Sequence, residues 1–318
     1  MSKRRHPFYF NFSSGDYYLL VIKNFFLITF TLGFYIPWAI VSEKKYVNSS
    51  INLAGNNFAY HGTGKELFLG FLKIFVLFVS VSFYFSFLSL NGLDSLLAIS
   101  VLVFYALMIL SVPYVIHNSW KYDMAKTSYM GKRFFYDSDF QAFLIEFTKE
   151  GVLLLCTFFI YFPWYITNLT RHLCDNTRIG NIDIRFEGKG GQLFGIMLKG
   201  ILLTIVTFGI YLFQHRANII KFFHENIKLY QDGEEIEVKS RIGGGDIFIN
   251  VVTFALITLL TFGLGLPYAI LKSKQLFIET LSIEGEIDFE SFEQSPSYDD
   301  QYVNNLGMSL DEGIDAAF

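Results

Sequence analysis

One eight-residue phrase recurs at the ends of the long apolar runs of this chain, and it constrains the fold more than any other feature. Its gapless copies are Thr31-Leu-Gly-Phe-Tyr-Ile-Pro-Trp38, Thr157-Phe-Phe-Ile-Tyr-Phe-Pro-Trp164, Thr207-Phe-Gly-Ile-Tyr-Leu-Phe-Gln214 and Thr261-Phe-Gly-Leu-Gly-Leu-Pro-Tyr268. With a degenerate copy ending at Pro113-Tyr114, the key position falls at Pro37, Pro113, Pro163, Phe213 and Pro267. Self-similarity of this kind is typical of one supersecondary unit used several times. The sequence therefore predicts a duplicated architecture.

The apolar runs are too long for ordinary core helices, and 52% of the residues are hydrophobic against 17% charged. The runs extend from Tyr18 to Val41, Leu67 to Leu90, Leu96 to Ile116, Val152 to Ile166, Leu193 to Phe213 and Ile249 to Leu271. Most reach the ~20 residues that cross a ~30 Å hydrocarbon layer. We expect an all-α multi-pass membrane protein with about six transmembrane helices, in which the short fourth run draws on the apolar residues ahead of it.

A glycine follows each key position after about the same number of residues, and apolar and polar residues alternate around it. These glycines are Gly55, Gly131, Gly180, Gly233 and Gly285. Period-two alternation around a glycine predicts a short, membrane-proximal β-hairpin. We divide the membrane domain, residues 1–292, into units of about 8–60, 61–136, 137–186, 187–238 and 239–289.

The side of the membrane on which each hairpin lies is left open by the charges. Units that cross once place successive hairpins on opposite sides, unless some apolar runs are re-entrant and broken at their Gly and Pro residues. Lys and Arg residues flank the first run on both sides, as in Lys3-Arg4-Arg5 and Lys44-Lys45, which is awkward for either orientation. Either the hairpins share one face, or the interfacial lysines serve lipid contact.

The remaining segments add little chemistry. From Gln275 to Phe318 there are eleven acidic residues and no Lys or Arg, and we expect residues 293–318 to form an acidic, disordered tail. The two cysteines, Cys156 and Cys174, form no framework and are interpreted as packing thiols.

The most specific polar pattern is a lysine seven residues after an acid or amide at a helix start: Asp16 to Lys23, Glu66 to Lys73 and Gln192 to Lys199. Seven residues is close to two helical turns, so each pair lies on one helix face. Lysines within apolar runs are costly, and Lys23, Lys73 and Lys199 are the candidate contacts for a lipid headgroup or solute. The alternative is that each lysine snorkels to the interface.

The phrase itself supplies a structural motif, which we assign to the ends of the membrane helices. Proline ends a helix where the next backbone donor is not needed, and aromatic residues suit the headgroup level. Hinge motion at the prolines is the alternative. The motif residues are Gly33, Tyr35, Pro37, Trp38, Pro163, Trp164, Gly209, Tyr211, Gly263 and Pro267.

Catalytic, metal and nucleic-acid signals are weak. His172, Cys174 and Asp175 lie close in sequence, but no second cluster with ligand spacing completes a metal site. The glycine runs around Gly190 and Gly244 lack the Gly-Lys-Ser/Thr ending of a phosphate loop. We expect no cofactor, no metal, no nucleic-acid partner and no enzymatic activity.

The chain resembles the YjgN-like family of bacterial inner-membrane proteins, a domain family of unknown function. The resemblance is carried by Thr31-Leu-Gly-Phe-Tyr-Ile-Pro-Trp-Ala39, Lys44-Lys45-Tyr46, Gly55-Asn-Asn-Phe-Ala-Tyr-His-Gly62, Gly191-Gln-Leu-Phe-Gly195 and Thr207-Phe-Gly-Ile-Tyr211, and it covers Phe8 to Phe289. It implies a multi-pass protein of the bacterial inner membrane and brings no activity, substrate or catalytic residue. The basic segment after Pro37 is thinner here than in the family pattern.

Together these observations favour an integral membrane protein of transporter-like or channel-like type, with a lipid or small solute near the repeated lysines. The alternative is a scaffold or envelope-organising protein that transports nothing. Membrane lipids are the expected partners in both cases, and the substrate and oligomeric state stay open.

Overall fold

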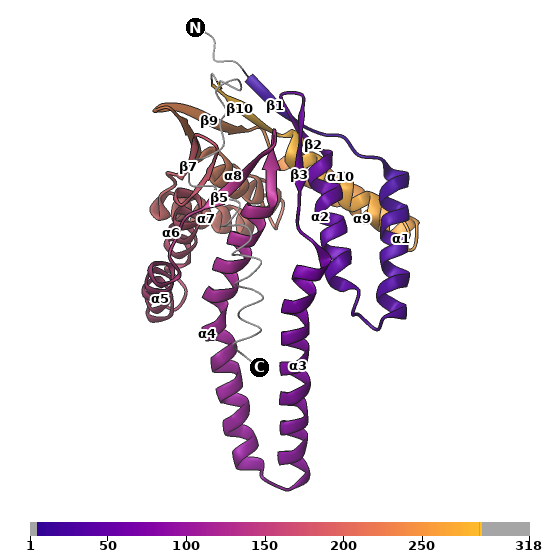
Figure 1. Ribbon diagram of the computed structural model, residues 1–318. Coiled ribbons are helices and arrows are strands. Elements are labelled where there is room, and N and C mark those ends of the chain that lie inside the picture. Colours follow the sequence, from indigo (N-terminus) through magenta and orange to yellow (C-terminus); the bar gives the residue numbers. More distant parts are fainter. Residues whose placement is uncertain (1–4, 286, 288–318) are drawn as a thin grey trace.

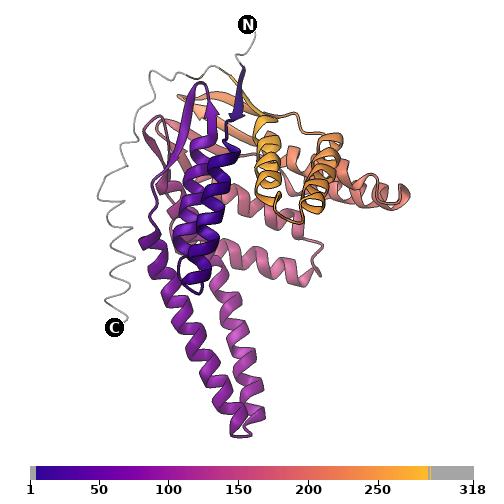
Figure 2. The ribbon, with the colours of Figure 1, turned by 90° about the vertical axis from the view of Figure 1, so that its right-hand side faces the viewer.

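The computed structural model describes residues 5–285 and residue 287, and it arranges them as two stacked rings. Short antiparallel strands form one ring, and helices form the other ring below it (Figure 1). Two long helices, α3 (Gly64–Leu90) and α4 (Asp94–Lys126), project beyond the others on the side away from the strands (Figure 2). We call the two sides of the molecule the strand end and the helix end.

The helices come in five successive pairs, each followed along the chain by strands. Besides α3 and α4, the pairs are α1 (Ser14–Phe30) with α2 (Ile36–Ser50), α5 (Phe140–Cys156) with α6 (Phe162–Asp175), α7 (Gly190–Val206) with α8 (Leu212–Glu225), and α9 (Gly244–Leu260) with α10 (Leu266–Glu279).

The strands are three to seven residues long. They are β1 (Arg5–Phe10), β2 (Ile51–Leu53), β3 (Asn56–Tyr60), β4 (Thr127–Tyr129), β5 (Lys132–Tyr136), β6 (Thr177–Ile179), β7 (Ile182–Phe186), β8 (Ile227–Gln231), β9 (Glu234–Ser240) and β10 (Leu281–Glu284). Every strand pairs antiparallel with two neighbours, so the described strands form one closed barrel.

Four hairpins of this barrel lie at four of the glycines identified in the sequence, Gly55, Gly131, Gly180 and Gly233, and each of these glycines has a positive φ. The fifth position is built differently. Strand β10 ends just before Gly285, and its second neighbour is β1 from the other end of the chain, with Arg5 opposite Glu284. The first and last described strands therefore close the ring.

Successive helix pairs are locked together where the aromatic end of the phrase meets a glycine. A Cβ atom on Gly64 would lie within 3.0 Å of the Trp38 ring, and one on Gly190 would meet Trp164 in the same way. Gly244 meets Gln214 in the same way, so α3, α7 and α9 each begin beside the start of the second helix of the preceding pair. These glycines permit close packing as well as marking a helix start.

The expected all-α fold with about six transmembrane helices is wrong, because the described strands form a closed barrel and the long apolar helices are fewer. Among the described residues only α3 and α4 are long and apolar enough to cross a membrane, whereas α7 and α9 are shorter apolar helices. The other long apolar runs are each divided by a tight turn, so the phrase begins a second helix that runs back. Pro37, Pro163 and Pro267 accordingly lie in the first turn of a helix, where their missing N–H costs nothing, instead of at a helix exit.

Alternating hairpins are excluded by the same finding. All described strands belong to one closed barrel, so every hairpin lies at the strand end. The re-entrant alternative, in which Gly and Pro break the apolar runs and the hairpins share a face, describes the fold. Residues 293–318, the expected acidic tail, lie outside the described residues.

Candidate functional site

The turns that join the helices of four pairs are built alike, at residues 31–35, 157–161, 207–211 and 261–265. In the first turn, the Thr31 hydroxyl donates to the carbonyl of Leu27 at 2.6 Å and accepts from the N–H of Tyr35 at 3.0 Å. The same two hydrogen bonds are made by Thr157, Thr207 and Thr261. The repeated threonine therefore closes a turn in each of these four pairs.

A bulky apolar residue follows each of these threonines in the left-handed backbone region, and its side chain is almost fully exposed. The exposed fractions are 90% for Leu32, 89% for Phe158, 97% for Phe208 and 96% for Phe262, with φ near +50° in each case. Left-handed backbone is unfavourable for such residues, and exposing them to water adds a further cost. Four equivalent exposures of this kind indicate a surface that does not face water. We call these four residues the apolar tips.

The pair α3 and α4 also exposes apolar side chains, and it extends further from the strands than the apolar tips do. Its two helices are joined by the turn Asn91-Gly92, and their apolar side chains are largely exposed, such as Phe83 at 74% and Leu102 at 71%. By length, α3 alone spans about 40 Å at 1.5 Å per residue, enough for a bilayer core of ~30 Å. The hairpin is the part of the structure suited to cross the membrane.

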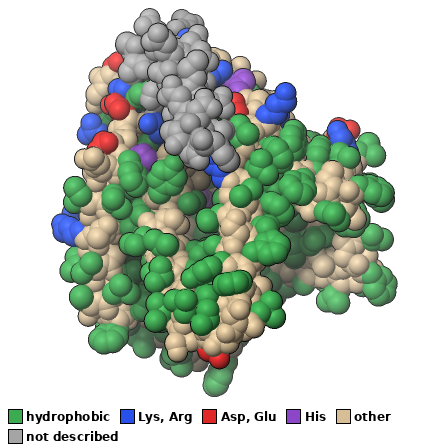
Figure 3. All heavy atoms as spheres, turned by 60° about the horizontal axis from the view of Figure 1, so that its bottom comes forward, with side chains coloured by type: hydrophobic (Ala, Val, Ile, Leu, Met, Phe, Trp, Pro, Cys, Tyr) green, Lys and Arg blue, Asp and Glu red, His purple; other side chains and the backbone are tan. Residues whose placement is uncertain are grey.

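Charge is distributed oppositely to these apolar side chains. Seen from the helix end, hydrophobic side chains cover the exposed helix surfaces, while most charged side chains gather toward the strands (Figure 3). Ion pairs lie at the strand end, among them Lys228 with Glu235 at 2.8 Å and Lys239 with Glu237. Such a one-sided division matches a molecule that stands on a membrane with its helix end buried.

The three candidate lysines lie at matching positions of α1, α3 and α7, and all three are exposed. The structure does not bring Lys23, Lys73 and Lys199 together, because they belong to three different helix pairs. Two of their three sequence partners serve as helix caps: Glu66 accepts from the N–H of Thr63, and Gln192 accepts from the N–H of Lys189. The acid or amide therefore stabilises the helix start.

One of these lysines faces an open polar groove of about 610 Å³ between α7 and α8. Its lining includes Lys199, Asn218, Lys221 and Glu225. A second groove, lined by α2 with Leu20 of α1 and with Ala59 and Tyr60 of β3, has Ser42, Lys45 and Ser49 at the positions of Asn218, Lys221 and Glu225. One lysine of the second helix lines each groove, Lys45 in one and Lys221 in the other. Lys45 was noted in the sequence as an interfacial lysine, but Lys221 was not, although the 176 residues between them equal the spacing of Pro37 and Phe213.

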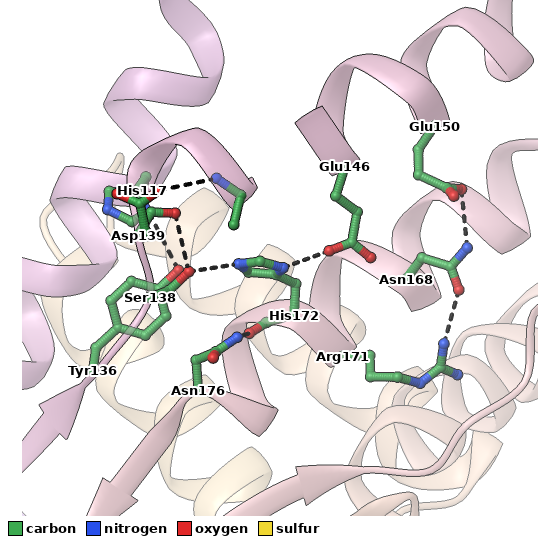
Figure 4. A network of polar contacts seen from close by, with 11 residues as sticks. His117, Tyr136, Ser138, Asp139, Glu146, Glu150, Asn168, Arg171, His172 and Asn176 are labelled. Atoms are coloured by element: carbon green, nitrogen blue, oxygen red, sulfur yellow. Dashed lines mark hydrogen bonds and ion pairs between the residues drawn. The ribbon is translucent and has the colours of Figure 1, made fainter. Parts of the chain in front are cut away.

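A polar network joins α5 and α6, as Figure 4 shows. The imidazole of His172 lies between the Ser138 hydroxyl, at 2.8 Å from Nε2, and the Glu146 carboxylate, at 2.5 Å from Nδ1. Beside it, the Asn168 amide donates to the Glu150 carboxylate at 2.9 Å. The order hydroxyl, imidazole, carboxylate is that of a nucleophilic triad.

Two observations favour a structural role for this network. The cavity against His172 measures only about 10 Å³, about the size of one water molecule. The residues at the matching position of α2 and α4 make the same kind of bridge within their own pair: Tyr46 bonds Ser13 and Tyr122 bonds Glu66. His172 therefore fits a repeated clamp between the second helix and the start of the first.

The neighbouring residues do not form the metal cluster considered from the sequence. Asp175 accepts a hydrogen bond from the N–H of Phe186 at 2.8 Å. Cys174 is buried, and burial, with a smaller contribution from Asp175, raises the pKa of its thiol to about 12, so it is unreactive. No group of three or more His, Cys, Asp or Glu side chains suited to a metal ion occurs within the described part of the chain.

Comparison with known proteins places this architecture in a family. The family model described as "Bacterial protein of unknown function (DUF898)" matches residues 5–185 and 181–237. Proteins named inner membrane protein YjgN are similar: the one from Salmonella typhimurium is 26% identical over 206 residues, which are 64% of this chain and 45% of that protein. The one from Escherichia coli O157:H7 is 32% identical over 129 residues, 41% of this chain and 30% of that protein.

The matched regions thus span less than half the length of these curated relatives. No solved structure matches the chain. The names of the relatives agree with the expected inner-membrane location, and the resemblance noted in the sequence is confirmed. Since the family model covers more than half of the chain, this protein belongs to the DUF898 family of bacterial proteins, whose function is unknown.

Proposed function

We propose that this protein is an integral membrane platform of the bacterial inner membrane, inserted mainly from one side. In this proposal the apolar tips enter one leaflet, the hairpin of α3 and α4 crosses the bilayer as two spans, and the barrel stands at the membrane surface. The observation that carries it is the placement of four almost fully exposed apolar tips opposite a single closed barrel. The role is that of a lipid-binding scaffold built from five repeated units, without transport or catalysis.

The scaffold role is favoured over a channel by the interior of the barrel. Apolar side chains pack along its axis, among them Leu53, Tyr129, Ile236 and Ile283, so it offers no wet path for an ion or polar solute. The three lysines that suggested a solute site are exposed on separate helix pairs. A transporter would need polar groups that converge on one cavity.

Anionic lipid headgroups are the ligands that the lysines suit best in this arrangement. Each lysine lies a few turns below a helix start, within snorkelling reach of the interface. A lysine near an anionic membrane surface contributes about 1 kcal/mol to lipid binding. We propose that Lys23, Lys73 and Lys199, together with the groove lysines Lys45 and Lys221, contact phosphate groups of lipids.

Spin labelling tests the insertion of the tips. Nitroxides at Phe208 and Phe262, placed in a background where Cys156 is serine and Cys174 is alanine, are expected to be relaxed by oxygen, which concentrates in the bilayer. A label at Glu235 on the barrel is the control, and it is expected to be relaxed by a water-soluble nickel chelate. Accessibility of the two tip labels to the nickel chelate would refute the platform.

Lipid analysis tests the proposed headgroup contacts. We expect mass spectrometry to find less anionic lipid copurifying with a Lys23→Gln, Lys73→Gln, Lys199→Gln variant than with the wild type. The matched control changes three barrel lysines, Lys132, Lys228 and Lys239, to Gln. Equal loss of lipid in both variants would show that total charge, and not the helix lysines, retains the lipid.

A further inference from the structure

The interior of the barrel contains a partly open apolar cavity of about 190 Å³ that the platform does not require. Every residue that lines it is apolar or aromatic, and the hydroxyl of Tyr129 points away from it to bond the carbonyl of Leu53 at 2.8 Å. An apolar cavity of about 150 Å³ in another protein stays dry and binds benzene or xenon. This cavity is somewhat larger and equally apolar.

Five cross-strand pairs surround the cavity, one at each junction between neighbouring hairpins. The paired residues are Phe8 with Leu53, Phe58 with Tyr129, Phe134 with Ile179, Ile184 with Leu229, and Val238 with Ile283. All ten belong to the lining. The cavity therefore lies on the barrel axis and is part of the repeated architecture, not a local packing fault.

The side chains of these cross-strand pairs differ in size around the barrel, and the smaller ones leave the cavity unfilled. On the second strand of each hairpin, counting β1 as the partner of β10, three of the five lining positions of these pairs hold Phe: Phe8, Phe58 and Phe134. The ring of Phe58 packs on those of Phe8 and Tyr129, with centroids 6.5 Å and 4.7 Å apart. The other two second-strand positions hold the smaller Ile184 and Val238. A ten-stranded barrel has more interior to fill than an eight-stranded one, so small residues at two positions leave room.

We propose that this cavity binds a hydrocarbon group: either a small apolar molecule or the end of a lipid acyl chain. When empty, a cavity of this size forfeits packing contacts along its apolar lining, which makes it costly to keep without an occupant. The absence of polar lining excludes water as that occupant, because a buried water needs two to four hydrogen-bond partners. The ring lining selects a compact hydrocarbon without polar groups.

Two substitutions to phenylalanine, which the chain already has at the matching positions of other units, are expected to fill the cavity. Ile184→Phe and Val238→Phe place at these positions the residue that the other three units carry there. Asp183→Leu is the control, because Asp183 precedes Ile184 and is exposed on the outer face of the same strand. We expect the two filling variants to fold with the helix content and elution volume of the wild type, and to melt at an equal or higher temperature.

Photolabelling with localisation of the labelled peptides tests occupancy. The probes are octyl diazirine, added to purified protein, and phosphatidylcholine with a diazirine at the acyl terminus, in vesicles. Labelling of β3 and β8 peptides is expected in the wild type and in Asp183→Leu, and its loss is expected in both filling variants. In the octyl diazirine arm, labelling of peptides containing the exposed residues Phe208 and Phe262 serves as the internal control, since it is expected to be the same in all four proteins.

The two probes distinguish the sources of the hydrocarbon. Barrel labelling by the lipid probe identifies an acyl chain, and barrel labelling by octyl diazirine alone identifies a small free molecule. Barrel labelling by neither probe, or labelling that persists unchanged in Ile184→Phe and Val238→Phe, would overturn the proposal. Neither result depends on whether the tips insert into a membrane, so the cavity and the platform can fail separately.

Discussion

At the scale of single residues, small side chains decide how closely neighbouring units approach. Gly190 lies against Trp164, whereas the next residue, Gly191, has open space where a Cβ would be. In the sequence we noted of the glycine run around Gly190 only that it lacks the ending of a phosphate loop. The contact of Gly190 with a tryptophan 26 residues earlier depends on tertiary packing, which no local pattern encodes.

The pair Gly190 and Gly191 gives a matched test of this packing. Gly190→Ala is expected to lower the free energy of unfolding by about 1 to 3 kcal/mol, because the added methyl group overpacks against the Trp164 ring and backbone. Gly191→Ala is expected to be neutral or slightly stabilising, because alanine favours helix and meets nothing. Thermal unfolding of both variants measures the difference, and equal effects would contradict the packing.

A half-buried histidine, His224, makes the stability depend on pH. Burial lowers the pKa of His224 below its usual value, and its Nδ1 lies 3.4 Å from the Ser240 hydroxyl. The unfolded chain therefore binds the proton more readily, and stability is expected to fall as pH drops through the unfolded-state value near 6.5. Asn48 occupies the matching position in α2, so His224→Asn is a native-like replacement.

We expect the wild type to lose melting temperature between pH 7.5 and 5.5 more steeply than His224→Asn. Part of the slope is expected to remain, because burial also lowers the pKa of His215. Melting curves of the two proteins in the same detergent measure the difference. Identical slopes would show that His224 keeps its ordinary pKa in the folded protein.

At the scale of elements, the apolar runs were located correctly but their number of crossings was not. Hydropathy counts residues and cannot detect a reversal inside a run. The turn at Thr31 depends on two hydrogen bonds of its side chain and on positive φ at Leu32 and Gly33, and these features are set by geometry and not by hydrophobicity. In three of the four turns, a proline in the first turn of the next helix begins the helix that runs back.

The signal that distinguishes the two outcomes was present in the sequence. In the pair that is suited to cross, Pro113 lies inside α4 and the threonine and glycine of the phrase are absent, so the helix continues to Lys126. The four intact copies mark turns, and the degenerate copy marks the continuous helix. A complete phrase therefore predicts a reversal.

At the scale of the whole molecule, the closure of the barrel is the feature that the sequence did not predict. Four hairpins were visible as alternating residues around a glycine, but the pairing of β1 with β10 joins residues about 280 positions apart. The hairpin expected around Gly285 has β1 as its described second strand, while residues 286, 288 and 289, at the end of the expected unit 239–289, lie outside the described residues. Pairing over such a distance leaves no local pattern.

A disulfide tests this closure. With Cys156 and Cys174 replaced, cysteines at the paired positions Arg5 and Glu284 are expected to cross-link on oxidation and to raise the melting temperature. Glu237 pairs with Glu284 and lies one strand further from β1, so cysteines at Arg5 and Glu237 are the control and are expected to stay reduced. Cross-linking in the control alone would show a different strand order.

The central claim, a platform with every hairpin on one side of the membrane, is tested most directly by cysteine accessibility in intact and permeabilised cells. Single cysteines at Asn57, Asp183 and Asp232 report the barrel, and a cysteine at Asn91 reports the turn between α3 and α4. The account predicts that the three barrel positions react with a membrane-impermeant maleimide from the same side, and that Asn91 reacts from the opposite side. Reaction of Asp183 on the side opposite to Asn57, as six alternating spans require, would contradict it.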